Sequence, residues 1–270
     1  MARPAGAGRS RRSLRARGSV VVGVATFGVL FVAWYVLTTL THTISPGRFP
    51  SPAEVWDALV QINVTGYADA RLWEHVLHSV KLVLLGFFAA TLVGVPLGLA
   101  MGASRAFEAF VNPAFLLIRP IPPLAWIPLA IVWLGLGDAA KVLIIWFAAF
   151  VPAVINSYSG VRAIEPHLIE AARMLGVPRR MFVREVLIPG ALPMIFTGLR
   201  LSMQACWTTL VAGELIGAIA GLGHVLYQAS LDLFPAMIIV GMAAVAATGA
   251  AMTALIGWTE KRVMPWRKPA

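Results

Sequence analysis

Six long apolar runs constrain the fold of this chain more than any other feature of its sequence. Each is close to the ~20 residues that an α-helix needs to cross ~30 Å of hydrocarbon. The chain is 59% hydrophobic and 13% charged, whereas a soluble domain is about half apolar and about a quarter charged. The sequence therefore predicts an all-α integral membrane protein with six transmembrane helices, at roughly Val20–Leu40, Val76–Met101, Pro113–Leu134, Val142–Tyr158, Pro193–Ile216 and Pro235–Trp258.

Basic residues gather on one side of this six-helix pattern and predict its orientation. Cytoplasmic loops of membrane proteins collect Lys and Arg, so both termini and the segment 162–192 are expected in the cytoplasm. The same rule explains the net charge of +10 without a nucleic-acid partner. The opposite loops hold only Arg48, Arg71 and Lys141. The sixteen residues on the basic side are Arg3, Arg9, Arg11, Arg12, Arg15, Arg17, Arg105, Arg162, Arg173, Arg179, Arg180, Arg184, Lys261, Arg262, Arg267 and Lys268.

This topology divides the chain into five parts. They are a basic cytoplasmic tail (1–19), a first transmembrane helix (20–40), an extracytoplasmic loop (41–75), a transmembrane core (76–258) and a second basic cytoplasmic tail (259–270). Ser10–Leu14 is similar to a twin-arginine export signal, but the apolar run that follows is long for a signal core, which favours an uncleaved span. In the outer loop, Ser51, Pro52 and Glu54 predict the start of a short helix.

The segment 162–192 is charged and helix-like although it lies between two apolar runs. Residues 162–175 are expected to form a helix whose apolar face comprises Ile164, Leu168, Ala171, Ala172 and Leu175. Gly176 is expected to end it in the left-handed conformation. Pro178 then starts a second short helix, which Pro189 and Pro193 end. Two interpretations stay open from the residues alone: a solvated amphipathic loop, or a helix that docks on another protein through its small side chains.

The same segment resembles the cytoplasmic loop of ATP-binding-cassette (ABC) importer permeases. That family has Glu-Ala-Ala, then Gly four positions later, then an apolar pair and Pro about thirteen positions beyond the Gly. Here the matching residues are Glu170, Ala171, Ala172, Gly176 and Pro189. The resemblance implies a type I ABC importer permease fold in which this loop is the coupling helix that contacts a cytoplasmic ATPase. It extends from about His75 to Arg267.

Other stretches resemble the subfamily that imports nitrate, taurine and other alkanesulfonates. They are residues 119–129, 198–200, 210–215 and Gly221-Leu222-Gly223. The resemblance implies a small anionic solute, and related permeases import bicarbonate or thiamine precursors instead.

The resemblance also implies the partners of this chain. It implies a second, identical permease copy, a cytoplasmic ATPase dimer that holds ATP and Mg²⁺, and an extracytoplasmic solute-binding protein, with membrane lipid around the spans. The chain itself is expected to bind no cofactor or metal and to catalyse no reaction, because it has no phosphate-binding GxxxxGK[ST] motif and no catalytic constellation.

Residues inside the apolar runs are candidates for the solute pathway or its gate. Prolines interrupt the third run, and a broken helix is tolerated at membrane depth only where protein or a wet cavity satisfies the freed backbone groups. Arg119 suits an anion but also suits the cytoplasmic interface, and Glu214 suits a basic partner or the cap of a broken helix better than an anion. The candidates are Arg119, Pro122, Pro123, Trp126, Gln204 and Glu214.

Small residues at four- and eight-residue steps predict close helix packing along the second run. They are Gly86, Gly94, Gly98 and Gly102, and such spacing lets helices approach without a hydrophobic drive. Two other functions stay open: a secondary transporter driven by an ion gradient, which needs an intramembrane carboxylate, and a membrane-embedded enzyme, which needs a nucleophile–base or metal set.

Overall fold

A computed structural model of the chain describes residues 22–41, 47–215, 217 and 220–266. Within these ranges the fold is helical, with a single isolated bridge between Tyr67 and Ala70 in place of any sheet. A first helix spans Val22–Leu40 and ends in the π-turn η1 (Val36–Leu40). The remaining elements are α2 (Pro52–Val64), α3 (Leu72–Ala103), α4 (Arg105–Ile118), η2 (Pro123–Trp126), α5 (Ile127–Leu134), α6 (Asp138–Arg162), α7 (Pro166–Met174), α8 (Arg179–Phe182), η3 (Val183–Leu187), α9 (Ile188–Glu214), α10 (Leu222–Leu231) and α11 (Pro235–Val263).

The membrane-spanning prediction is confirmed. Five helices of the described chain are long and apolar enough to cross a membrane, and α4 with α5 makes a sixth if this bent pair counts as one span. Several of these helices extend past the apolar runs into polar residues: α3 begins at Leu72 and α6 runs from Asp138 to Arg162.

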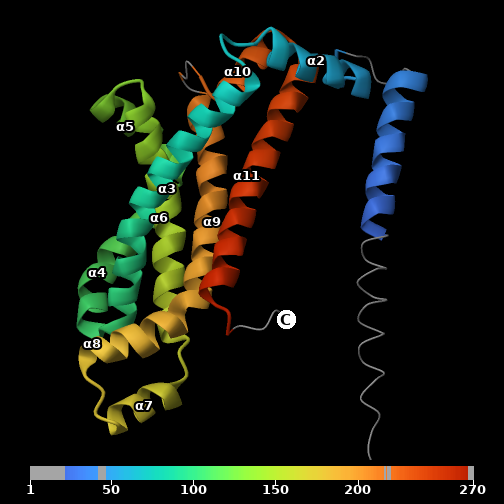
Figure 1. Cartoon of the computed structure of the whole chain (residues 1–270). Coiled ribbons are helices and arrows are strands. Elements are labelled where there is room, and N and C mark those ends of the chain that lie inside the picture. The colour runs from blue at the N-terminus through green and yellow to red at the C-terminus, as the bar shows by residue number, and fades with distance from the viewer. Residues whose placement is uncertain (1–21, 42–46, 216, 218–219, 267–270) are drawn as a thin grey trace, which may run out of the picture.

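The centre of the bundle is α6, which packs between α3 and α9 (Figure 1). The predicted glycine seam of α3 faces α6 along its whole length. A methyl group at Gly98 would lie 2.4 Å from the Val154 carbonyl oxygen, and one at Gly86 would lie 2.5 Å from Ile145 Cγ2. Small residues therefore let the two backbones touch. Cys206 of α9 is buried in the same core.

The first helix stands apart from the other helices, and α2 connects its end of the chain to the bundle (Figure 1). Only 6% of its apolar window is buried. The start of α2 has the predicted capping box: the Glu54 N–H donates to Ser51 Oγ, and the Ser51 N–H donates to the Glu54 carboxylate. Ala58 and Ile62 of α2 pack with residues of α10 and α11, which fixes α2 on the end of the bundle opposite to α7 (Figure 1), called the outer end below.

The third predicted span differs from the structure. It begins at Arg105 rather than Pro113, and it is bent by 82° between α4 and α5. The bend falls between Ile118 and the start of η2 at Pro123, where Pro120, Pro122 and Pro123 lack the N–H groups that would continue the helix. Pro113 lies inside α4 and does not end it.

Residues 179–214 form one continuous helix, so Pro189 and Pro193 do not stop a helix as the sequence predicts. The π-turn η3 shifts the hydrogen bonding by one residue, with the Ile188 N–H donating to the Val183 carbonyl. Such a turn accommodates Pro189 at the start of α9. Pro193 lies inside α9.

Candidate functional site

The segment 162–192, called the coupling loop below after its predicted role, lies at the end of the bundle opposite to α2 and α10, with α7 at its tip (Figure 1). The expected helix over 162–175 begins later, at Pro166, because α6 continues to Arg162 and Pro166 is preset for a first helical turn. The prediction for Gly176 is confirmed, with a φ of 65°. The Gly176 N–H donates to the Arg173 carbonyl and the Val177 N–H to the Ala172 carbonyl, which together make a Schellman motif. α8 begins at Arg179, with Pro178 as its cap.

The apolar residues in and beside α7 differ in how deeply they are buried. Ala172 is buried, and Ile164 just before the helix packs with Val161, Leu187 and Ala191 of the bundle. The other apolar residues point outward: Leu168 is 55% exposed and Leu175 is 80% exposed, and Glu170 and Ala171 are exposed with them. Within this chain the residues predicted to share one face thus differ in burial: Ile164 and Ala172 are buried, and the other three are exposed. The outward residues, Leu168, Ala171 and Leu175, are called the outer face of α7 below.

Three of the predicted pathway residues meet at the helix break. Arg119, Pro123 and Trp126 line a hollow of about 200 Å³ against α6. Pro122 lies in the same turn and is exposed. The break thus places one cation beside an otherwise apolar hollow.

Gln204 lies elsewhere, in a groove of about 930 Å³ between α9 and α11. Trp207 and Gly249 line this groove with it, and Arg200 at one end forms an ion pair with Glu260 of α11. The structure therefore places Gln204 and the helix break in different hollows of the single chain.

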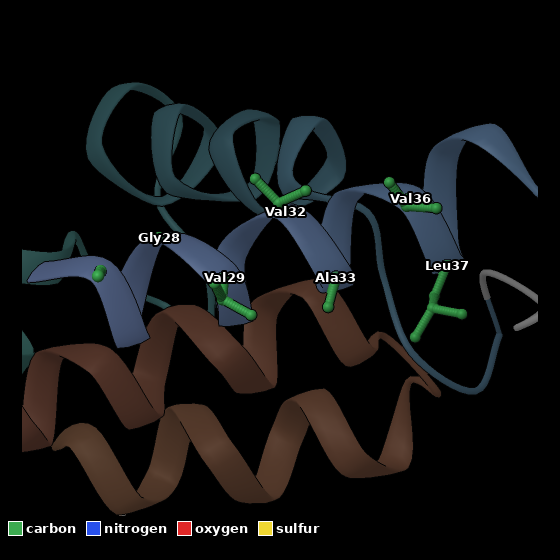
Figure 2. A pocket seen from close by; sticks show the side chains of 7 residues that line it. Gly28, Val29, Val32, Ala33, Val36 and Leu37 are labelled. Atoms are coloured by element: carbon green, nitrogen blue, oxygen red, sulfur yellow. The ribbon is translucent and has the colours of Figure 1, made fainter. Parts of the chain in front are cut away.

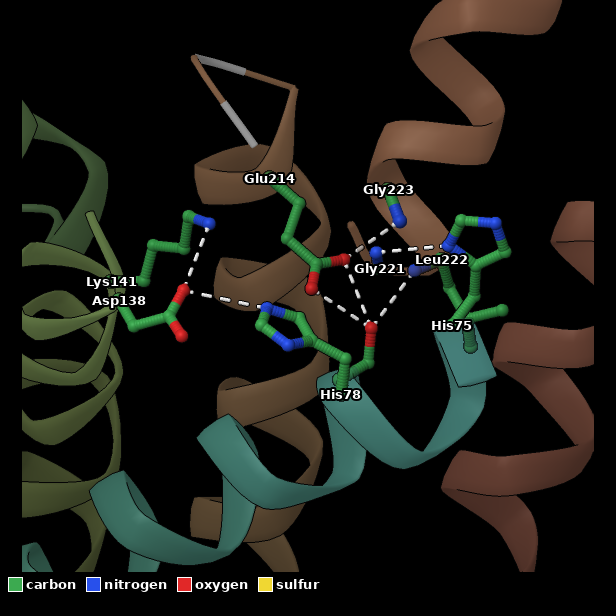
Figure 3. Close-up of polar contacts among 9 residues, drawn as sticks. His75, His78, Asp138, Lys141, Glu214, Gly221, Leu222 and Gly223 are labelled. Atoms are coloured by element: carbon green, nitrogen blue, oxygen red, sulfur yellow. Dashed lines mark hydrogen bonds and ion pairs between the residues drawn. The ribbon is translucent and has the colours of Figure 1, made fainter. Parts of the chain in front are cut away.

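Glu214, the last residue of α9, is fully buried at the outer end of the bundle. Its carboxylate accepts hydrogen bonds from the Ser79 hydroxyl at 2.8 Å and from the Gly223 N–H at 2.7 Å (Figure 3). The geometry supports the predicted role of Glu214 as a helix cap, because the Gly223 N–H that it accepts from lies in the first turn of α10.

Sequence reasoning missed the partners that surround Glu214. Lys141 belongs to the first turn of α6 rather than to a loop; it is 7% exposed, and its Nζ lies 3.3 Å from an Asp138 carboxylate oxygen. His78 Nε2 lies 3.4 Å from the same oxygen (Figure 3). His75 and Ser79 are buried four residues apart on α3. Their spacing on one helix face was the available signal.

The first helix presents a hollow of about 670 Å³ lined only by apolar residues and glycine, among them Val29, Val32 and Leu37 (Figure 2). No polar side chain lines it, so nothing in it orients a polar solute. Its chemistry suits lipid or another helix.

Comparison with known proteins identifies the family to which this chain belongs. Residues 83–266 match the family described as the binding-protein-dependent transport system inner membrane component. The chain belongs to this family. Its permease fold is also that of a chain of the MetNI methionine ABC transporter, solved in inward-facing conformations, with a TM-score of 0.57 and 23% identity, covering 73% of this chain and 98% of that chain.

Three permeases with named transport systems are similar over nearly the whole chain. The taurine transport system permease protein TauC of Escherichia coli (strain K12) is 37% identical, over 92% of this chain and 90% of its own. The putative aliphatic sulfonates transport permease protein SsuC of Bacillus subtilis (strain 168) is 28% identical, over 94% and 90%. The bicarbonate transport system permease protein CmpB of Synechococcus elongatus (strain ATCC 33912 / PCC 7942 / FACHB-805) is 27% identical, over 97% and 95%. This chain is thus an inner-membrane permease of an ABC importer, and its relatives are transport permeases rather than enzymes.

Proposed function

We propose that two identical copies of this permease form the translocation pathway for a small anionic solute of the sulfonate class. The solute class rests on the 37% identity to a taurine permease, against 28% and 27% for the permeases named for aliphatic sulfonates and bicarbonate. A solute-binding protein delivers the solute on the extracytoplasmic side. Two ATPase subunits bind ATP and Mg²⁺ on the cytoplasmic side, and this chain binds neither.

The observation that carries the proposal is the outer face of α7. Leu168 and Leu175 are more than half exposed on a helix that is anchored to the bundle by its other side. Burying apolar surface is favourable by about 25 cal/mol per Å², so these side chains favour a protein partner. Arg173, Arg179 and Arg180 around them belong to the basic side of the chain, which the positive-inside rule assigns to the cytoplasm. The partner that fits there is the ATPase.

The proposed topology has both termini in the cytoplasm. The first helix begins, and α11 ends, toward the side on which α7 lies (Figure 1). The last turn of α11 holds Lys261 and Arg262, and the tail 1–21, outside the described residues, holds six arginines and no acid. Both features support a cytoplasmic position for these ends.

The ATPase contact is tested by co-purification. Ala171→Glu puts a charge on the outer face of α7, where Ala171 is exposed, and leaves the buried Ala172 in place. We expect the tagged variant to retain its membrane insertion and to lose the ATPase subunit and its activity. Ala106→Glu is the matched control, because Ala106 is also exposed but lies in the first turn of α4. Equal ATPase recovery with Ala171→Glu and wild type would contradict the proposed coupling role.

The solute is tested in proteoliposomes that hold the permease, its ATPase and its binding protein. We expect ATP-dependent uptake of radiolabelled taurine or an alkanesulfonate, with no effect of an ionophore that collapses ion gradients. ATP-dependent uptake of bicarbonate or a thiamine precursor alone would correct the solute class. Uptake that needs an ion gradient and no ATP would support the secondary transporter instead.

A further inference from the structure

The coupling loop and the outer end of the bundle are joined by one helix. Residues Arg179–Glu214 are helical without interruption over 36 residues, about 54 Å measured along the helix path, and this path turns between α8 and α9 (Figure 1). This helix begins three residues after Gly176, the turn that ends α7, and it finishes at the buried Glu214. The coupling loop and the buried end of α9 therefore belong to one hydrogen-bonded helix.

The first turn of α10 is held by three side chains from two other helices. The first N–H groups of a helix have no partner within it. Here the Gly221 N–H donates to His75 Nδ1 at 3.1 Å, the Leu222 N–H donates to Ser79 Oγ at 2.9 Å, and the Gly223 N–H donates to Glu214 at 2.7 Å (Figure 3). The Ser79 hydroxyl in turn donates to Glu214, so α3, α9 and α10 share one buried network.

The backbone of α10 is shaped around the Glu214 side chain. A methyl group on Gly221 would lie 2.1 Å from Glu214 Oε1, and one on Gly223 would lie 2.6 Å from Glu214 Cβ. Gly221 also has a φ of 125°, which strains any other residue. The two glycines of the Gly-Leu-Gly sequence therefore let the first turn of α10 lie directly against the Glu214 side chain.

The far end of α10 is tied to the same network. The Tyr67 hydroxyl donates to the carboxylate of Asp232, the residue after α10, at 2.5 Å. His75 Nε2 lies 2.9 Å from the Tyr67 carbonyl oxygen. Because His75 Nδ1 accepts from Gly221, its proton is on Nε2, which donates to Tyr67. Both ends of α10 are thus fixed, while Tyr227 and Leu231 on its surface are exposed.

We propose that Glu214 is a positioning residue of the transport cycle. It fixes the first turn of α10 to the outer end of the helix that starts at the coupling loop, so that contact of the solute-binding protein with α10 is passed along α9 to α7. The inference rests on the proposed importer function. A carboxylate suits this role because it accepts from Ser79 and Gly223 at once, whereas an apolar side chain would leave both donors buried without a partner.

The test uses the complete complex in lipid nanodiscs and compares its ATPase activity with and without solute-loaded binding protein. Glu214→Gln keeps the size of the side chain but replaces one acceptor oxygen by a donor group. We expect co-purification of the ATPase and a basal activity within about twofold of wild type, and an about tenfold loss of the stimulation by binding protein, within the usual range of coupling between sites. The ratio of stimulated to basal activity is the readout, because a merely structural role would lower both together.

Glu74→Gln is the matched control. Glu74 also caps a helix at the outer end, accepting from the Arg71 N–H at 2.7 Å, but it does not join α10 to α9. Its ratio should equal that of wild type. An unchanged ratio in Glu214→Gln, or a parallel loss of basal and stimulated activity, would overturn the proposal.

A second variant decides the question if Glu214→Gln fails to assemble. Ser79→Ala removes the hydroxyl that donates to Glu214 and accepts from the Leu222 N–H, and so weakens the link between Glu214 and the first turn of α10. A lowered ratio in this variant supports the proposal and an unchanged ratio overturns it. A wild-type complex that shows no stimulation would refute the importer function itself, and the positioning role with it.

Discussion

The indole of Trp126 stacks on the phenyl ring of Phe147, with ring centroids 4.1 Å apart and planes 9° apart. Trp126 ends η2 just before α5, and Phe147 lies in the middle of α6. The stack therefore holds the break between α4 and α5 against the central helix α6. Glu108 at the other end of α4 accepts a hydrogen bond from Tyr158 of α6 at 2.5 Å and pairs with Arg162. The bent pair is therefore attached to α6 at two places, the start of α4 and the break.

Loss of this stack should loosen the break. Trp126→Ala removes an aromatic pair worth about 0.5–1.5 kcal/mol beyond its area burial, so we expect a clear fall in the midpoint of thermal unfolding in detergent. Trp126→Phe, which can still stack, should lose less. Trp133→Ala is the control, since Trp133 lies on α5 but is 60% exposed. Equal midpoints for the two alanine variants would show that the stack does not hold the break.

The glycine seam between α3 and α6 gives a steric prediction. A methyl group at Gly98 would lie 2.4 Å from the Val154 carbonyl oxygen, which is backbone and cannot turn aside. Gly98→Ala should therefore force the helices apart and destabilise the fold by about 1–3 kcal/mol, the usual cost of overpacking. Gly28→Ala in the first helix meets nothing within 4 Å and should leave the unfolding midpoint unchanged or raise it. Comparable midpoints for the two variants would refute the close approach.

Local patterns in the sequence predicted those features that depend on local geometry. Long apolar runs predict the spans, and the spacing from Gly86 to Gly102 predicts the α3 seam, because both depend on the regular geometry of one helix. Gly176 and Ser51 predict helix ends, because each acts on the backbone turn beside it.

Features that depend on distant residues were not predictable in this way. The 82° bend follows from how α5 packs on α6, and prolines alone indicate only that a helix stops. The hydrogen bond from Ser79 to Glu214 could not be predicted from local sequence, because the two residues lie 135 positions apart. The burial of Lys141 likewise depends on how the outer ends of α3, α6 and α9 meet.

The coupling loop gives a prediction about backbone conformation alone. Gly176 has a φ of 65°, and a Cβ there would meet nothing within 4 Å. A residue other than glycine would thus cost about 1–2 kcal/mol of backbone strain, but its Cβ would not clash with any neighbour. We expect Gly176→Asn, which tolerates this conformation, to keep most solute uptake, and Gly176→Val to lose much more. Uptake that falls equally in both variants would mean that the position needs a small side chain rather than a left-handed turn.

The contact between Tyr67 and Asp232 predicts a dependence of stability on alkaline pH. Burial, and then the hydrogen bond to Asp232, raise the pKa of Tyr67 above its ordinary value. A raised pKa means that the folded protein holds this proton more tightly than the unfolded chain does. The contribution is therefore fully present below pH ~10, the ordinary tyrosine pKa, and is lost as the pH rises above it.

Tyr67→Phe tests this contact because it removes only the hydroxyl. We expect the variant to be less stable by about 1 kcal/mol at neutral pH, the usual net value of one hydrogen bond, and to show a weaker decline in unfolding midpoint than wild type above pH ~10. Tyr227→Phe is the matched control, since Tyr227 lies on α10 with its side chain 41% exposed. If Tyr67→Phe and wild type lose stability in parallel over this pH range, another group causes the decline and the Tyr67 hydroxyl does not secure the end of α10.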